Sequence, residues 1–545
     1  MIDRTCDFCI IRPDSSSPPS GKKRRIMKPN FRYLTIYSAL ALLLSGATAL
    51  AGASRRPVAE NPKYVFFFLG DGMSSTQIEA SAAFKAGDEN DAETLMAQSN
   101  RLHMTQLPVT GLAETFAANR FITDSAAAVT AFACGCKTRP GTLGRNASLD
   151  TSYRSIAELA QERGRAIGMI SSTPLSHATP AGYYANVNSR DNYCEIGYQA
   201  AQSGFEFFGG ARFSKLDSDK NAGKVVLKQA FIDAGYTTLA GKNEILQLKD
   251  KELGKVICTV ANSHDGSSMP FAIDRPAGNF TLAEITQVAI NYLQNDPEGF
   301  FILVEGGKID WACHDNDAAT ALLELIAFDD AVGVACDFLA KHPSETPIVV
   351  TGDHETGGLG IGFKGNRYQT QLNLLKGQKK SGKQFYNEDL PAYRQTHPWT
   401  GVECNIDADM KTLIQTTFGL DWEQLSEYQQ EQLEKAYDAS FGLVKHDGRP
   451  SGYDLDGECD VDYLSYGGKD PLTVTLTHIL NNEAGLQWTT ASHTAIPVPV
   501  MAAGAGSGLF TGFYDNTDIA RKLSVLMNTP TLPVEDPSRS GPSAF

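Results

Sequence analysis

Residues 64–72 read Tyr-Val-Phe-Phe-Phe-Leu-Gly-Asp-Gly, so six consecutive apolar residues run directly into a glycine-rich turn that carries one acid. Aromatic and β-branched residues in an unbroken run of this length are typical of a strand that is buried on both faces. Such a strand belongs to the interior of a sheet that helices cover on both sides. The stretch therefore predicts a central strand that ends at Asp71.

Three further runs of this kind end in residues that can carry chemistry. They are Ala166–Ile170 before a loop with His177 and Thr179, Phe300–Val304 before Glu305, and Ile348–Val350 before Asp353 and His354. Helical patterns such as 317–341 lie between the runs, and this alternation predicts a three-layer α/β/α sandwich on a mostly parallel central sheet. Because ligands bind beyond the carboxyl ends of the strands in such sheets, we expect these polar side chains to converge there.

Composition and charge narrow the class of protein. The chain has 545 residues, of which 42% are hydrophobic, and its formal net charge is −15. A globular protein of one large or several smaller domains fits this composition, whereas a disordered or collagen-like chain does not. The acidic balance argues against a nucleic-acid partner, which would require a basic surface.

The N-terminal region reads as a targeting signal. A basic cluster at 22–25 precedes an apolar run at 34–44 and the small-residue site Ala49-Leu50-Ala51. This order predicts an N-terminal extension and signal peptide over 1–51, a catalytic domain over 52–545, and a periplasmic or secreted protein without a membrane anchor after cleavage. Either Met1 or Met27 is the start. Of ten cysteines, eight follow the predicted cleavage site, and their pairing is left open.

The region between the last two candidate histidines differs from the rest of the chain. From about 364 to 470 it is rich in Gln, Tyr and Asp, and 423–437 has the pattern of a polar helix. We interpret 364–480 as an insertion or lid near the active site.

Asp310 and His314 are four residues apart, which places both on one face of a helix. His493, from a distant segment, could complete a three-ligand site, and three protein ligands with an open position are typical of a catalytic zinc. The alternative for this pair alone is an acid that caps the helix and a histidine that packs.

A second cation could bind Asp71, Asp353 and His354, each of which follows a strand. Glu305 with Thr179 would suit an ion that prefers oxygen, such as magnesium. The alternative for Asp71 is a simple Asp-Gly turn. Taken together, the residues predict two or three metals around one pocket, an arrangement that can bind attacking and leaving oxygens.

A nucleophile and an anion-binding residue are also predicted. Ser125 begins an Ala-rich helical pattern, where the helix dipole favours a phosphate and a bound metal could activate the hydroxyl. Arg190 could hold phosphate oxygens with its planar guanidinium. The alternatives are a helix N-cap at 123–125 and a surface ion pair at Arg190.

Taken in chain order, six motifs resemble those of the alkaline phosphatase family. They are Gly70-Asp71-Gly72-Met73, Thr123-Asp124-Ser125-Ala126-Ala127, His177-Ala178-Thr179-Pro180-Ala181, Val304-Glu305-Gly306-Gly307-Lys308-Ile309-Asp310 with His314, Thr351-Gly352-Asp353-His354-Glu355-Thr356-Gly357-Gly358, and His493-Thr494-Ala495.

The resemblance implies a phosphomonoesterase of broad substrate range that acts through a phosphoserine at Ser125, with two Zn²⁺ and one Mg²⁺. It implies the following ligand sets: Asp310, His314 and His493 for one zinc; Asp71, Asp353, His354 and Ser125 for the other; Glu305, Thr179 and the shared Asp71 for magnesium. It also implies that Arg190 binds the phosphate, that small phosphomonoesters are the substrates, and that the protein is a homodimer.

Two positions depart from some bacterial members of that family, which have aspartate in place of His177 and lysine in place of Trp311. Histidine at this position resembles the animal and certain marine bacterial forms, and implies that His177 holds magnesium through water. Three alternatives to a monoesterase remain: a phosphodiesterase of the same superfamily, an exported metal- or phosphate-binding protein without activity, and a zinc peptidase. A serine nucleophile together with Arg190 and Glu305 favours the monoesterase.

Overall fold

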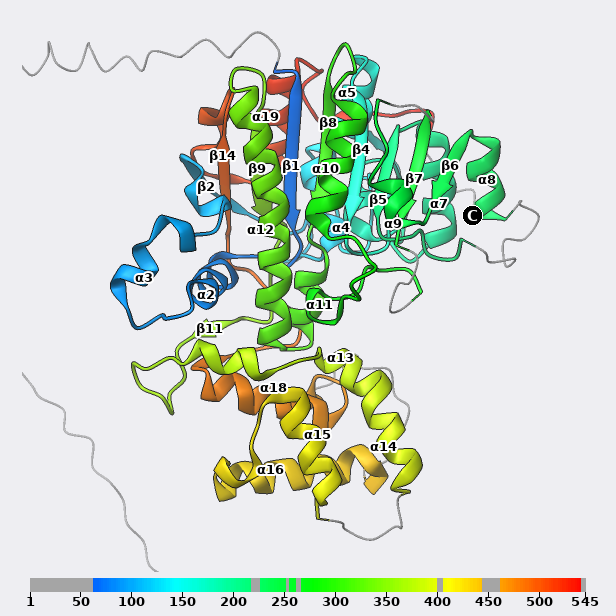
Figure 1. The fold of residues 1–545 in the computed structure, drawn as a ribbon. Coiled ribbons are helices and arrows are strands. Elements are labelled where there is room, and N and C mark those ends of the chain that lie inside the picture. Colours follow the sequence, from blue (N-terminus) through cyan, green and yellow to red (C-terminus); the bar gives the residue numbers. More distant parts are fainter. Residues whose placement is uncertain are drawn as a thin grey trace, which may run out of the picture. The chain divides into compact units, whose positions relative to one another are not determined.

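The computed structural model describes residues 62–216, 226–250, 254–260, 266–398, 405–443 and 461–540, so the predicted signal peptide at 1–51 lies outside the described residues. Ten strands form one sheet (Figure 1), in the order β15 (Gly512–Asp515), β2 (Val109–Glu114), β14 (Val498–Ala503), β9 (Ile348–Gly352), β1 (Tyr64–Gly70), β8 (Phe300–Glu305), β4 (Ala166–Ser171), β5 (Phe207–Gly210), β7 (Lys255–Thr259) and β6 (Tyr236–Leu239).

Within this sheet β14 is antiparallel to both neighbours, and the other neighbouring strands pair in parallel. The predicted mostly parallel sheet is therefore confirmed. The four runs predicted as strands are the consecutive neighbours β9, β1, β8 and β4, and each extends one or two residues beyond the predicted end. In the register Leu69 and Ser171 both lie opposite Glu305, so the carboxyl ends of these strands share one edge.

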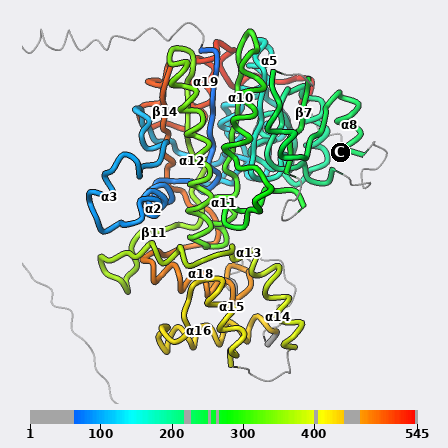
Figure 2. Tube along the Cα trace, viewed as in Figure 1, coloured from blue at the N-terminus to red at the C-terminus, as the bar shows by residue number. Residues whose placement is uncertain are grey.

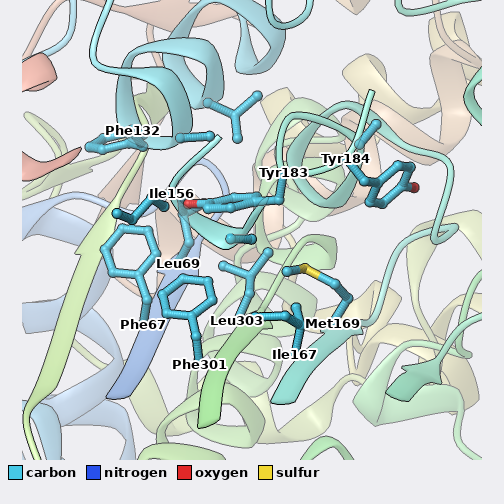
Figure 3. Close-up of a cluster of buried hydrophobic side chains, with 14 of the residues drawn as sticks. Phe67, Leu69, Phe132, Ile156, Ile167, Met169, Tyr183, Tyr184, Phe301 and Leu303 are labelled. Carbon is cyan, nitrogen blue, oxygen red and sulfur yellow. The ribbon is translucent and has the colours of Figure 1, made fainter. Parts of the chain in front are cut away.

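Both faces of the sheet are covered. Along β1 the buried side chains alternate: Val65, Phe67 and Leu69 belong to one hydrophobic cluster, whereas Tyr64, Phe66 and Phe68 belong to another. Figure 3 shows the first cluster, where Phe67, Leu69, Phe301 and Leu303 of the strands meet Phe132, Ile156 and Tyr183. This alternation follows from the strand period of two residues, because every side chain of a central strand must pack against one helical layer or the other.

The helices divide between these two layers. The first cluster includes residues of α4 (Ser125–Cys134), α5 (Ile156–Glu162), α6 (Ala178–Ala181), α7 (Tyr193–Ser203), α8 (Leu227–Asp233) and α19 (Thr517–Met527). The second includes residues of α2 (Ser75–Ala86), α9 (Lys242–Ile245), α10 (Leu282–Leu293), α11 (Lys308–His314) and α12 (Ala318–Lys341). A short helix, α3 (Ala92–Met96), follows α2. The helix predicted over 317–341 is α12, with Asp317 as its N-cap.

The region 364–480, predicted as an insertion or lid, is largely helical in its described parts, 364–398, 405–443 and 461–480. Its helices are α13 (Gly382–Gln384), α14 (Leu390–Thr396), α15 (Ala408–Phe418), α16 (Glu427–Asp438), α17 (Val461–Tyr466) and α18 (Pro471–Glu483), traced in yellow and orange in Figure 2. A third hydrophobic cluster joins α14, α15, α16 and α18 to Phe84 of α2 and to Ala318, Ala319 and Leu322 of α12. Its status as an insertion and its role as a lid remain predictions.

Short strand pairs lie outside the main sheet. They are β10 (Glu355–Thr356) with β13 (His493–Thr494), β11 (Gly360–Ile361) with β12 (Leu486–Gln487), and β3 (Tyr153–Arg154) with β16 (Val534–Glu535). The first of these pairs brings His493 beside the loop that follows β9, although 139 positions separate His493 from His354 in the sequence.

The cysteine positions give no evidence of a bridge among the described residues. Six cysteines fall in the described ranges and all of them are free thiols: Cys134, Cys136, Cys194, Cys258, Cys313 and Cys336. Burial raises the pKa of the Cys136 thiol to about 12. Cys404 and Cys459 lie outside the described residues, so their pairing remains open.

Candidate active site

Each central strand delivers a polar side chain to the shared edge of the sheet. Asp71 follows β1, Glu305 ends β8, and Asp353 and His354 follow β9. All four are fully buried. The turn after β1 requires glycine at position 72, because its φ is +74° and a Cβ there would lie 2.8 Å from Cα of Asp310. The predicted convergence of the strand ends is thus observed in the structure.

Three clusters of candidate metal ligands lie at this edge, and they are numbered separately from the hydrophobic clusters. The first cluster of ligands consists of Asp310 and His314 on α11 and His493 on β13. Nε2 of His314 lies 3.3 Å from Oδ2 of Asp310 and 3.1 Å from Nε2 of His493. Nδ1 of His314 contacts the Ala491 carbonyl at 2.7 Å, and Nδ1 of His493 contacts the Thr123 carbonyl at 2.8 Å. A carbonyl only accepts, so each Nδ1 donates its proton and each Nε2 faces the other residues of the cluster.

The second cluster consists of Asp71, Asp353 and His354. Nε2 of His354 lies 3.1 Å from Oδ2 of Asp353 and 3.5 Å from Oδ1 of Asp71. The other oxygen of Asp353 accepts hydrogen bonds from the backbone N–H groups of Gly72, at 3.0 Å, and of His354, at 2.9 Å. These two bonds fix the carboxylate and leave Oδ2 facing the imidazole.

The third cluster consists of Asp71, which it shares with the second, together with His177 and Glu305. Ser171 and Thr173 donate hydrogen bonds to Oε2 of Glu305, whereas Oε1 has no hydrogen-bond partner among the described residues. Thr179 is buried on α6, two positions after His177, which is the N-cap of that helix. The indole of Trp311 meets the His177 ring edge to face, with 5.9 Å between their centres.

The electrostatics of these clusters favour cations. Burial raises the pKa of Asp71, and the charges of Asp353, Asp310 and Glu305 raise it further. Burial raises the pKa of Glu305 to about 7, against the opposing effect of its bond from Ser171. Both oxygens of Asp71 lack a hydrogen-bond partner among the described residues. Buried carboxylates that repel one another and lack donors fit metal ions, which would supply the missing positive charge.

The histidines respond to the same environment. Burial lowers the pKa of His177 to about 3, and burial likewise lowers the pKa values of His354 and His493. Burial also opposes the charge of His314, but the Asp310 carboxylate outweighs it and raises the pKa of His314 to about 9. The lowered pKa values keep His177, His354 and His493 neutral, which is the state in which histidine binds a metal, whereas His314 would lose its proton on binding one.

Ser125 lies where the predicted nucleophile is expected. It is the first residue of α4, it is buried, and its Oγ lies 3.2 Å from Nε2 of His354. Asp124 is the N-cap of this helix and accepts a hydrogen bond from the Ala127 N–H at 2.9 Å. The helix ends at Gly135, whose φ of 69° suits a residue without a side chain.

Arg190 is held against the start of the same helix. Its Nη1 lies 3.2 Å from Oδ2 of Asp124, and its Nη2 lies 2.9 Å from Nε2 of His177. Arg190 therefore does form an ion pair, as the alternative interpretation expected. The pair is half-buried, however, and its acid is the residue immediately before Ser125. Asp124 also accepts a hydrogen bond from the Gly141 N–H, so one carboxylate positions both the helix start and the guanidinium.

Sequence reasoning gave no role to Glu355 and Thr356, which the structure places directly behind the clusters. Glu355 accepts hydrogen bonds from Gln77 and from the N–H groups of Gly358 and Leu359. Thr356 contacts both Asp310 and His354. The signal available in the sequence was an acid and a hydroxyl directly after Asp353 and His354, in the loop that follows the strand.

Comparison with known proteins agrees with this geometry. The sequence profile of the alkaline phosphatase family matches residues 62–207 and 206–529. Alkaline phosphatase 3 of Bacillus subtilis is 27% identical over 494 residues, which cover 89% of this chain and 94% of that protein. The tissue-nonspecific alkaline phosphatase of Gallus gallus is 31% identical over 339 residues, which cover 54% of this chain and 63% of that protein.

A solved structure agrees as well. The cold-active alkaline phosphatase of the psychrophile Shewanella sp. superposes with a TM-score of 0.66 at 29% identity, over 85% of this chain and 99% of that one. A serine at a helix start beside buried carboxylate–imidazole clusters, at the carboxyl edge of a parallel sheet, defines a metal-dependent hydrolase. With the profile match across most of its length, the chain belongs to the alkaline phosphatase family.

Membership confirms three predictions at the level of the family: the resemblance itself, the α/β sandwich, and an enzyme that is an alkaline phosphatase acting on small phosphate substrates. The family is metal-dependent, and the three clusters provide candidate metal-binding groups. Within the described residues, no helix combines the length and apolar character needed to cross a membrane.

Proposed function

We propose that the protein is a phosphomonoesterase that forms a phosphoserine at Ser125 and uses two zinc ions and one magnesium ion. The observation that supports this most directly is the position of Ser125. Its Oγ lies 3.2 Å from Nε2 of His354, a member of the second cluster, whose Asp71 is also a member of the third. Two groups that carry lone pairs at this separation fit two ligands of a single ion.

The residues fit the proposed metals by ligand chemistry. Asp310, His314 and His493 would hold one zinc, since imidazole nitrogen and carboxylate oxygen are its usual ligands. Asp71, Asp353 and His354 would hold the second zinc, together with Ser125. Glu305, Thr179 and Asp71 would hold magnesium, which prefers oxygen, and His177 would contact it through water. When bound, the zinc ions would lower the pKa of the serine hydroxyl and stabilise charge on the leaving oxygen.

The protein groups then carry out a two-step transfer. The Ser125 oxygen bonds to phosphorus while the ester P–O bond on the opposite side breaks; the serine proton passes to solvent, and the leaving alkoxide takes a proton from water. In the second step water attacks the phosphoserine, Ser125 regains a proton, and inorganic phosphate leaves. Arg190 and the N-terminus of α4 bind the non-bridging oxygens during both steps.

This arrangement predicts a broad substrate range. The proposed contacts all go to the phosphate: the nucleophile Ser125, the guanidinium of Arg190 and the metal ligands. The alcohol part of the substrate is required only to leave. We therefore expect small phosphomonoesters of varied structure to be hydrolysed at similar rates.

The decisive assay compares p-nitrophenyl phosphate with bis-p-nitrophenyl phosphate before chelation, after chelation, and after zinc and magnesium are restored. We expect monoester hydrolysis that chelation abolishes and both metals restore. Ser125→Ala should lose turnover by orders of magnitude. The matched control is Ser155→Ala, because Ser155 is likewise a buried serine at a helix start, as N-cap of α5. That variant should retain turnover and lose about 1 kcal/mol of stability.

Other outcomes separate the alternatives. Full turnover by Ser125→Ala would exclude the phosphoserine. Faster hydrolysis of the diester would indicate a phosphodiesterase. A folded protein that binds zinc and magnesium without turnover would indicate a silent metal-binding protein.

We further propose that the protein is exported to the periplasm or the medium and is a homodimer. The basic cluster and apolar run within 1–51 support export, and the family resemblance supports the dimer. N-terminal sequencing of the exported protein tests cleavage after Ala51, and light scattering of the purified protein tests its mass.

A further inference from the structure

Thr356 is a buried residue that touches two of the three clusters. It lies on β10 directly opposite His493 on β13, so it also adjoins the third residue of the first cluster. Its Oγ1 lies 2.5 Å from Oδ1 of Asp310, a member of the first cluster, and 3.2 Å from Nδ1 of His354, a member of the second.

The protons at these contacts can be assigned by elimination. The threonine hydroxyl has a single proton, and an ionised carboxylate can only accept. The contact with Asp310, at 2.5 Å, has the length of a hydroxyl bond to a carboxylate, whereas the contact with Nδ1 of His354 is longer, at 3.2 Å. The hydroxyl of Thr356 therefore donates to Asp310. The remaining contact requires Nδ1 of His354 to donate to the hydroxyl oxygen.

This assignment determines which nitrogen of His354 is available. With the proton on Nδ1, Nε2 carries the lone pair. Nε2 is the nitrogen that lies 3.2 Å from Oγ of Ser125 and 3.1 Å from Oδ2 of Asp353. The opposite tautomer would direct a proton at the position where a metal ion would bind.

The anchor of His354 differs from those of the two histidines of the first cluster. His314 and His493 each donate from Nδ1 to a backbone carbonyl, at Ala491 and Thr123. A backbone carbonyl cannot be removed by substitution, whereas the Thr356 hydroxyl can. The surroundings of the Thr356 side chain are also closely packed. The preceding residue, Glu355, accepts hydrogen bonds from Gln77, Gly358 and Leu359. On another side, a Cβ at Gly72 would approach Oγ1 of Thr356 to 2.9 Å.

We infer that Thr356 is a positioning residue that sets the tautomer of His354 and connects it to Asp310, so that the first and second clusters are prepared for metal together. The part that concerns metal rests on the proposed function, whereas the tautomer does not. Groups behind metal ligands commonly act in this way, and their removal weakens metal binding by roughly 10- to 100-fold.

The first test measures the tautomer directly. The full chain is labelled with ¹⁵N at histidine, stripped of metal by chelation, and examined by long-range ¹H–¹⁵N correlation; His354→Asn identifies the His354 signals. We expect the proton on Nδ1 in the wild type and in Thr356→Ser, and a shift toward Nε2 in Thr356→Val. A wild-type His354 protonated on Nε2 would overturn the inference, even if Thr356→Val failed to fold.

The second test measures zinc binding by competition with a chromogenic chelator. We expect Thr356→Val to weaken zinc binding by about 10-fold or more, and Thr356→Ser to restore it. The matched control is Thr351→Val: Thr351 is equally buried, and its hydroxyl contacts the carbonyls of Gly352 and Pro499. Equal zinc affinity in Thr356→Val and Thr351→Val would overturn the inference. If the tautomer is as expected but no phosphomonoester is hydrolysed, the proposed function fails and the positioning role stands.

Discussion

The guanidinium of Arg190 lies 3.2 Å from the carboxylate of Asp124, the residue immediately before Ser125. Because Asp124 also caps α4, the proposed phosphate-binding arginine and the proposed nucleophile depend on a single side chain. This connection spans 66 positions of the sequence. It makes Asp124 a means of altering phosphate binding without touching a metal ligand.

Asp124→Asn should weaken phosphate binding more than it slows turnover. The amide can still accept the Ala127 N–H, so the helix cap is kept, but the charge that holds Arg190 is lost. We expect the KM for p-nitrophenyl phosphate and the inhibition constant for inorganic phosphate to rise together by several-fold. Steady-state kinetics with phosphate as competitor provide the measurement. Asp407→Asn, at the N-cap of α15, is the control and should change neither constant. An unchanged phosphate constant in Asp124→Asn would contradict the proposed role of the pair.

Gly72→Ala should damage the site and the fold together. Residue 72 has a φ of +74°, and a Cβ there would lie 2.8 Å from Cα of Asp310 and 2.9 Å from Oγ1 of Thr356. A left-handed backbone alone costs a residue other than glycine about 1–2 kcal/mol. We expect Gly72→Ala to lose zinc binding and to reduce the free energy of unfolding by well over that amount. Gly254→Ala isolates the backbone cost, because its φ is +72° and no atom lies within 4 Å of the added Cβ. Denaturant unfolding of both variants compares the two; equal losses would show that the contacts at Gly72 are unimportant.

Removal of metal should make stability fall as the pH rises from about 7 to about 9. The pKa of His314 is raised to about 9 in the folded protein, from an unfolded value near 6.5. A base with a raised pKa contributes stability that is complete below its unfolded pKa and is lost as the pH passes its folded pKa. The shift corresponds to on the order of 3 kcal/mol. Burial and its neighbours raise the pKa of Asp71, and an acid with a raised pKa acts in the same direction.

Thermal unfolding of the chelated protein at several pH values tests this prediction. The metal-loaded protein is the comparison, since a bound cation would replace the proton on His314 and remove the pH dependence of stability. Metal-free His314→Gln should show a smaller decrease than the metal-free wild type. A chelated protein whose stability rises between pH 7 and pH 9 would contradict the assignment of the ion pair between His314 and Asp310.

Asp317→Ala should lower the free energy of unfolding, because Asp317 connects the start of α12 to residues 378 and 382 of the region 364–480. Asp317 caps α12 and accepts hydrogen bonds from the Gly382 N–H at 2.8 Å and from Nε2 of Gln378 at 2.9 Å and 3.0 Å. Its removal leaves buried donors without a partner, so we expect a loss of about 2–4 kcal/mol. Asp407→Ala, which removes an N-cap with fewer partners, should lose about 1 kcal/mol. Similar losses in the two variants, measured by denaturant unfolding, would show that the bonds to 378 and 382 contribute little.

Much of the fold is readable from local pattern. The unbroken apolar runs before Asp71, Glu305 and Asp353 predicted three buried strands, and the structure places them as the neighbours β1, β8 and β9. The four-residue spacing of Asp310 and His314 predicted a shared helix face, and α11 places their side chains 3.3 Å apart. Both inferences succeed because they use only the period of a strand or a helix.

The order of the strands and the partners of distant residues were not readable in this way. Whether His493 reaches Asp310 depends on the pairing of β10 with β13, and no local period encodes that pairing. The contact of Arg190 with Asp124 was not readable either, since it joins residues 66 positions apart. The role of Thr356 required the atoms themselves, because a threonine in a motif does not reveal which neighbours share its single proton.

The sequence by itself thus determined the strand ends and the kinds of side chain that they carry: carboxylates, imidazoles and one serine at a helix start. The tertiary structure alone decided which of these meet, that Asp71 belongs to two clusters, and that Thr356 lies between Asp310 and His354. The physical reason is range. Periodicity and capping act over a few residues, whereas a cluster of buried charges forms only when segments separated by more than a hundred positions pack against the same edge of one sheet.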